Sequence, residues 1–178
     1  IGSVEYTSRP PESGPDLAAA RKASLICSAL TSFARTAVKS VMGPTATPTE
    51  IRHMQELLAQ GLNDGAVGMS SGLTYTPGMY ADTAELAALC EVVAEFGGFY
   101  APHTRSYGAG ALEAYAEMID LARITGCALH LTHATMNFGV NRGRAPEFLD
   151  MVDAGLADGC DITLDTYPYL PGATTLSA

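Results

Sequence analysis

A chain of 178 residues has the size of one ordinary domain, and with 47% hydrophobic and 16% charged residues it is too apolar to be disordered. No apolar run is long enough to cross a membrane, so we expect no membrane partner. The net charge of −9 and the absence of any Lys and Arg cluster argue against binding to nucleic acid.

Residues 1–46 are hard to interpret, and we assign them only as an N-terminal part of the same domain. Thr47-Pro48-Thr49-Glu50 is a capping box with Pro at the first helical position, so it predicts the start of a helix. Apolar residues then recur at helical spacing until Asn63-Asp64-Gly65 ends the helix: Ile51, Met54, Leu58 and Leu62.

Strands and helices alternate over residues 47–178. Predicted strands cover 66–70, 99–103, 127–133 and 161–165. One intervening helix is capped by Asp82 and Glu85, one carries a stripe that includes Leu112 and Tyr115 and ends at Gly126, and one covers 145–157.

The ends of the four strands are 33, 30 and 32 residues apart, a period typical of parallel strands joined by right-handed crossover helices. Both an open doubly wound sheet and a closed eight-stranded barrel show this period. Polar residues gather where the strands end, and no dinucleotide-type glycine fingerprint follows any strand. We therefore predict a partial (β/α)8 barrel of TIM type, with four consecutive βα units in residues 47–178. Because half a barrel has two unpaired edge strands, we expect this chain to be a fragment that needs the remainder of its polypeptide to close the barrel.

The four cysteines are scattered and form no C-x-x-C pair. Free cysteine is usually a small buried apolar residue, so we expect reduced side chains and a cytoplasmic location rather than a disulfide scaffold.

Two histidines, His103 and His133, end consecutive predicted strands. By strand alternation, His103 shares a face with Ala101, and His133 shares a face with Leu131. Neighbouring parallel strands lie about 4.8 Å apart, so two such imidazoles can bind one zinc ion. The alternative is that each histidine caps its strand and hydrogen-bonds a loop.

The other polar candidates rank lower. His130 is an odd number of residues from His133, so in an extended strand it points to the opposite face and is expected to face the helix layer. His53 is expected to lie on the solvated side of its helix. Asp165 also ends a strand, where it could bind a metal, orient a histidine or be an ordinary loop residue.

The run from Gly65 to Gly78, GAVGMSSGLTYTPG, resembles the strand-four signature of the N-acyl-D-amino-acid deacylases (D-aminoacylases) of the amidohydrolase superfamily. The resemblance continues in order through residues 80–86, 98–105, 132–133 and 165–174. It implies a barrel that carries a small β-domain and one or two zinc ions, with His103 and His133 as metal ligands. It also implies that a cysteine ligand, an H-x-H pair and the catalytic Asp lie outside this chain, which leaves no general base within it.

The same resemblance suggests substrate-binding residues. Tyr167 matches a tyrosine that contacts the substrate carboxylate, and Thr135 replaces a frequent lysine that helps to hold it. Thr74 stands where some members have an aromatic wall of the side-chain pocket. Arg105 is a further polar candidate, although a salt bridge that holds its loop is an equal alternative. Ala173 replaces a frequent serine, and Ser106-Tyr107 replace acidic residues.

These features predict zinc-dependent hydrolysis of a linear amide, the deacylation of small N-acyl-D-amino acids. Zinc would polarise the amide carbonyl and lower the pKa of water, and an Asp from outside the chain would transfer the proton. The isolated fragment is expected to be inactive. Two alternatives stay open: a metal-free barrel aldolase or isomerase that uses the histidines as acid and base, and a non-catalytic amidohydrolase relative.

Overall fold

The computed structural model describes residues 46–169 and 171–172. The expectations for residues 1–45 and for Ala173 lie outside the described residues. The described elements, in chain order, are α2 (Pro48–Asn63), β1 (Gly68–Gly72), η1 (Gly78–Tyr80), α3 (Thr83–Glu95), β2 (Phe99–His103), α4 (Ala111–Thr125), β3 (Ala128–Leu131), η2 (Gly139–Asn141), α5 (Ala145–Ala157) and β4 (Ile162–Leu164).

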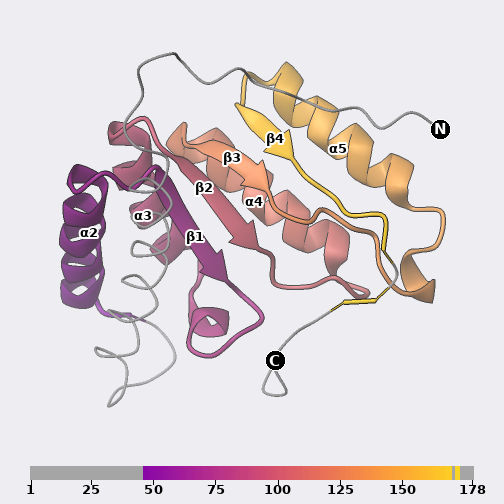
Figure 1. Ribbon diagram of the computed structural model, residues 1–178, viewed down its shortest axis with the longest axis horizontal. Coiled ribbons are helices and arrows are strands. Elements are labelled where there is room, and N and C mark those ends of the chain that lie inside the picture. Colours follow the sequence, from indigo (N-terminus) through magenta and orange to yellow (C-terminus); the bar gives the residue numbers. More distant parts are fainter. Residues whose placement is uncertain (1–45, 170, 173–178) are drawn as a thin grey trace.

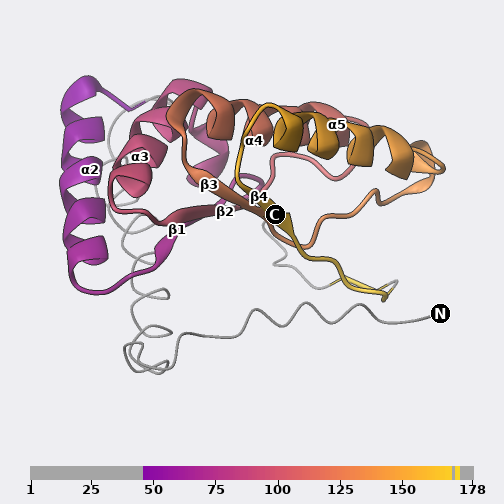
Figure 2. The same ribbon diagram turned by 90° about the horizontal axis from the view of Figure 1, so that it is seen from above.

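In this part of the chain, the four strands form one parallel sheet in the order β1-β2-β3-β4 (Figure 1). The described α-helices cover one face of the sheet, and no described helix covers the other (Figure 2). A doubly wound sheet has helices on both faces, whereas a barrel has all its helices on the outside. The one-sided helix layer therefore favours consecutive units of a barrel wall, as the polar residues at the strand ends predicted.

The helix boundaries follow from local chemistry that the sequence shows. At the start of α2, the Thr47 N–H donates to Glu50 Oε2 (2.7 Å) and the Glu50 N–H donates to Thr47 Oγ1 (3.3 Å), which confirms the capping box. Gly126 ends α4 with a left-handed φ of 69°, which glycine adopts without steric cost. The bounds of α5 coincide with the predicted helix.

The core lies between the sheet and its helix layer. Tyr100 on β2 and Leu129 and Leu131 on β3 point into it, each at most 2% exposed. The helices contribute side chains such as Leu58 and Met118. Among the described residues, no helix is long and apolar enough to span a membrane.

Strand alternation was predicted correctly for β2 and wrongly for the end of β3. In β2, Tyr100 is buried under the helices, while Phe99 and His103 are on the open face with partial exposure, as expected. In β3, Leu129 and Leu131 face the helices, so His130 faces the open side and not the helix layer. The predicted strand was also too long, because β3 ends at Leu131 and alternation does not extend to His133.

Candidate metal centre

His103 and His133 lie side by side where β2 and β3 end. The Nδ1 atom of His103 is 3.3 Å from the Nε2 atom of His133, and the two ring centroids are 5.0 Å apart at an interplanar angle of 71°. The sequence therefore identified the two side chains that meet, although it gave the wrong reason for the direction of His133.

The backbone of His133 turns its ring toward His103. Its φ of 40° is in the left-handed region, which is uncommon for a residue other than glycine. The Asp165 carboxylate accepts the His133 backbone N–H, and the Asp165 carbonyl accepts the Ala134 N–H at 2.7 Å. Asp165 therefore holds this turn in place, and the turn redirects a side chain that strand parity would have placed against the helices.

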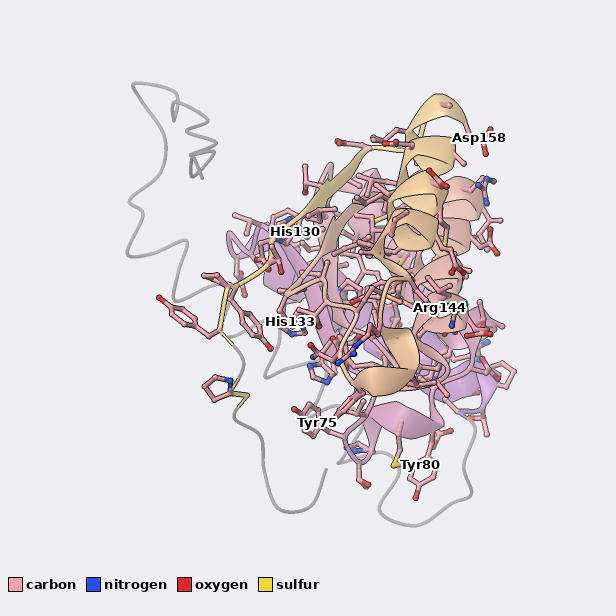
Figure 3. All side chains as sticks on the ribbon, turned by 90° about the vertical axis from the view of Figure 1, so that its right-hand side faces the viewer. Tyr75, Tyr80, His130, His133, Arg144 and Asp158 are labelled. Atoms are coloured by element: carbon pink, nitrogen blue, oxygen red, sulfur yellow. The ribbon has the colours of Figure 1, made fainter. Side chains whose placement is uncertain are left out.

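His130 and Asp165 form a contact on the open face. The His130 ring is hydrogen-bonded through Nδ1 to Thr163 Oγ1 (2.8 Å) and through Nε2 to Asp165 Oδ2 (3.1 Å). Figure 3 shows His130 and His133 on the side of the sheet that faces away from α5. Of the other sequence candidates, His53 lies exposed on α2 beside Glu56, as predicted.

Hydroxyl groups bind the outward-facing nitrogens of both rings. Thr74 Oγ1 is 2.9 Å from His103 Nε2, and Tyr107 Oη is 3.1 Å from His133 Nδ1. The Tyr107 ring also packs edge-on against His103, with centroids 4.9 Å apart. Sequence reasoning noted Tyr107 only as a departure from the family pattern. Its position four residues after His103 indicated that it lies near the site, but the sequence did not show its contact with His133.

The surroundings of His103 favour its neutral imidazole form. Burial and the neighbouring His133 lower the pKa of His103 below its ordinary value, so the ring stays unprotonated near neutral pH. Burial raises the pKa of Tyr107, so its hydroxyl keeps its proton. A metal ligand must be a neutral imidazole, which is the form that this environment favours.

The histidine pair opens into a cavity of about 600 Å³. Thr135 and Tyr167, both proposed as substrate contacts from the sequence, lie in its wall with His103 and His133. The backbone of Thr135 is fixed by the phenol of Tyr115, which donates to the Thr135 carbonyl (3.1 Å) and accepts its N–H (2.9 Å). A volume of this size suits a small organic molecule.

Arg105 is engaged away from this cavity. Its guanidinium donates to Glu117 through Nε (2.7 Å) and Nη2 (3.0 Å), and to the Ala81 carbonyl. This contact is the salt bridge that was the alternative to a substrate role. It ties the loop after β2 to α4 and to the loop that precedes α3.

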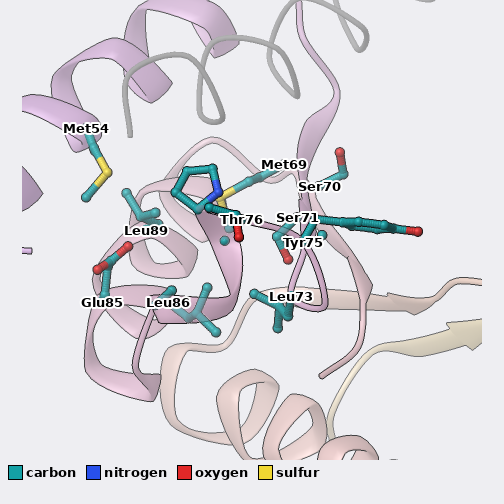
Figure 4. Close-up of a pocket in the computed structure, with 14 residues that line it drawn as sticks. Met54, Met69, Ser70, Ser71, Leu73, Tyr75, Thr76, Glu85, Leu86 and Leu89 are labelled. Carbon is teal, nitrogen blue, oxygen red and sulfur yellow. The ribbon is translucent and has the colours of Figure 1, made fainter. Parts of the chain in front are cut away.

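A second cavity of about 190 Å³ lies behind the loop that follows β1 (Figure 4). Its wall is mainly apolar, with Met54, Met69 and Leu89 among its residues. Tyr75 borders both cavities, and Figure 4 shows its ring pointing away from the methionine and leucine side chains. The Tyr75 ring lies 4.9 Å from that of His103, centroid to centroid, and so separates this apolar space from the histidine pair.

The donor set fits part of a zinc site. Two imidazole nitrogens that face a common point are ligands that zinc accepts. Within residues 46–169 and 171–172, however, no group of three or more His, Cys, Asp or Glu side chains is arranged to hold a metal ion. The described cysteines are elsewhere, with Cys90 and Cys127 buried in the core. A catalytic zinc site usually has three protein ligands, so a further ligand would come from outside the described residues.

Comparison with known proteins identifies relatives of this chain. The chain is 38% identical over 150 residues to N-acyl-D-glutamate deacylase from Alcaligenes xylosoxydans xylosoxydans. The aligned residues make up 83% of this chain and 30% of that protein. It is 33% identical to D-aminoacylase from the same organism, over 80% of this chain and 29% of the relative. No protein-family model matches the chain. The chain thus spans about 30% of the length of these curated relatives.

Solved structures of N-acyl-D-glutamate deacylase and D-aminoacylase also match the chain. N-acyl-D-glutamate deacylase from Bordetella bronchiseptica, in complex with zinc and a phosphonate that mimics the tetrahedral intermediate, superposes with a TM-score of 0.73 at 35% identity. A crystal structure of D-aminoacylase gives a TM-score of 0.72 at 34% identity. Each match covers 78% of this chain and 29% of the solved chain. The four described strands and their α-helices therefore correspond to part of the barrel of these enzymes.

Proposed function

This chain is homologous to part of the N-acyl-D-amino-acid deacylases of the amidohydrolase superfamily, and from that premise we propose that it contributes two zinc ligands to an amide hydrolase. The reaction is the hydrolysis of the amide bond of a small N-acyl-D-amino acid. The observation that carries the proposal is the 3.3 Å approach of His103 Nδ1 to His133 Nε2 beside a cavity of suitable size.

The residues of this chain would have distinct tasks. His103 and His133 hold one zinc ion, and a second ion is compatible with the binuclear centre described for D-aminoacylase. When bound, zinc would supply Lewis-acid chemistry at the amide carbonyl. Tyr167 and Thr135 contact the substrate from the cavity wall. Thr74 acts through the His103 ring that it touches, and Arg105 acts through the Glu117 ion pair that fixes its loop.

The general base and the other metal ligands are supplied by segments outside the described residues. In the described sheet, β1 and β4 are each paired on one side only, so each offers an edge to a further strand. We assign residues 47–178 to the catalytic barrel and residues 1–46 to an adjoining part of it. Free cysteines among the described residues agree with a cytoplasmic location, which we propose on that ground.

The test uses the full polypeptide that contains this sequence, purified with zinc. We expect stoichiometric zinc by elemental analysis and release of the free D-amino acid from N-acetyl-D-glutamate or N-acetyl-D-methionine, with the L-enantiomers as controls. A zinc-loaded protein inert on every N-acyl-D-amino acid would overturn the substrate assignment. A folded protein that takes up no metal would instead favour a metal-free barrel enzyme or a non-catalytic relative.

A further inference from the structure

We propose that Thr74 and Tyr107 are positioning residues for the metal centre, because their hydroxyls select which nitrogen of each histidine ring faces the site. When a metal ion is bound, each hydroxyl accepts the N–H on the far side of one ring. This leaves the lone pairs of His103 Nδ1 and His133 Nε2 directed at one point. The inference deepens the proposed function and rests on it for the identity of the ion.

The two rings present different nitrogens, and the hydroxyls account for the difference. An imidazole that binds a metal through one nitrogen carries its proton on the other, and the partner of that proton fixes the tautomer and the ring orientation. For His103 the outward nitrogen is Nε2, which lies 2.9 Å from Thr74 Oγ1. For His133 it is Nδ1, which lies 3.1 Å from Tyr107 Oη.

Both hydroxyls are held in place by contacts of their own. The Tyr107 oxygen accepts the Thr104 N–H at 3.1 Å, and the Tyr107 ring is packed against the rings of His103 and His133. The buried Asn141 side chain donates to the carbonyls of Tyr107 (3.0 Å) and Gly108 (2.8 Å), which fixes the loop backbone. A phenol anchored in this way has little freedom to move away from His133.

Thr74 is anchored through its neighbour. The Leu73 N–H donates to the His103 carbonyl at 2.9 Å, so the loop after β1 is attached to the end of β2. Leu73 itself is buried, with 3% of its surface exposed. The Thr74 hydroxyl is therefore attached to the residue whose ring it orients.

A hydroxyl differs from a carboxylate in this position because it can donate as well as accept. Without metal, one of the two facing nitrogens can donate its proton across the 3.3 Å gap, and Thr74 can then donate to His103 Nε2. With metal, both protons lie on the outward nitrogens and both hydroxyls accept. The hydroxyl pair therefore satisfies both rings in either state.

The test compares variants that remove only a hydroxyl, Tyr107→Phe and Thr74→Val, in the full polypeptide. Zinc affinity is measured by competition with a chelating dye. Side-chain ¹⁵N NMR of the metal-free protein reports the nitrogen that carries the proton in each ring. We expect each variant to bind zinc about 10- to 100-fold more weakly and to shift the tautomer of the histidine it contacted. Thr74→Ser, which keeps the hydroxyl, should restore the parent affinity.

Tyr80→Phe is the matched control, because Tyr80 is exposed in η1 and lies outside the wall of the histidine cavity. It should leave zinc affinity and both tautomers unchanged. Parent-like affinity together with unchanged ¹⁵N spectra in Tyr107→Phe and Thr74→Val overturns the inference. If the parent takes up no zinc, the proposed function fails, and the metal-free tautomer shifts alone then decide the inference.

Discussion

His133 and Asp165 are 32 residues apart in the chain, yet the Asp165 carboxylate accepts the backbone N–H of His133. This contact holds His133 at a φ of 40°, and that conformation brings its ring to His103. The geometry of the histidine pair therefore depends on the residue that follows β4 as well as on the ends of β2 and β3.

The first prediction concerns the metal. His103→Ala and His133→Ala should each remove most of the bound zinc, because each deletes one of two imidazoles that face the same point. Elemental analysis of the purified variants measures this directly. His53→Ala is the matched control, since His53 is exposed on α2, and it should keep the parent zinc content. Unchanged zinc in both site variants would sink the assignment.

The second prediction concerns the turn. Asp165→Ala leaves the His133 N–H without its carboxylate acceptor, which should cost about 0.5–1.5 kcal/mol of unfolding free energy at this exposed contact. It should also weaken zinc binding about 10- to 100-fold, because the ring is no longer held in position. Chemical denaturation and chelator competition measure the two effects. Asp165→Asn keeps an acceptor oxygen and should lose less unfolding free energy and less zinc affinity than Asp165→Ala.

Asp161→Ala is a suitable control for this variant, because Asp161 is an exposed acidic residue immediately before β4. It should change neither measurement. If Asp165→Ala retains parent zinc affinity, the turn does not depend on this carboxylate.

The regular features were predictable from the sequence because each has a local cause. The capping box at Thr47, the glycine that ends α4 and the period of the βα units depend on short-range chemistry or on parallel-strand geometry. The pairing of His103 with His133 was also predicted, because His103 ends β2 and His133 follows shortly after the neighbouring β3.

The rest of the site was not predictable from local patterns because it depends on contacts between loops. Alternation places a side chain only while the backbone stays extended, and β3 ends two residues before His133. The left-handed turn there requires Asp165, which follows β4, and no local pattern near His133 reveals this contact. The same limit applies to Tyr107, whose contact with His133 depends on the path of a loop.

The third prediction concerns the loop after β2. Glu117 binds the Arg105 guanidinium through two contacts and also accepts the Thr83 hydroxyl at 2.8 Å. Glu117→Gln removes the charge from this mostly buried carboxylate and should lower the unfolding free energy by about 1–3 kcal/mol. Glu147→Gln disrupts the more exposed pair with Arg144 and should have a clearly smaller effect. Equal losses in urea denaturation of the two variants would contradict this reasoning.

The last prediction concerns Tyr115, which fixes the Thr135 backbone beside the cavity. Burial raises the pKa of Tyr115 from 10.0 to about 12, so the folded protein favours the neutral phenol. This contribution to stability is complete below pH 10 and is lost as the pH rises toward 12. Tyr115→Phe should therefore be less stable at pH 7, by about 1–2 kcal/mol for the lost hydrogen bonds, but lose stability less steeply above pH 10. Urea denaturation from pH 7 to 11 measures both effects, and parallel pH curves for the variant and the parent would refute the role of this phenol.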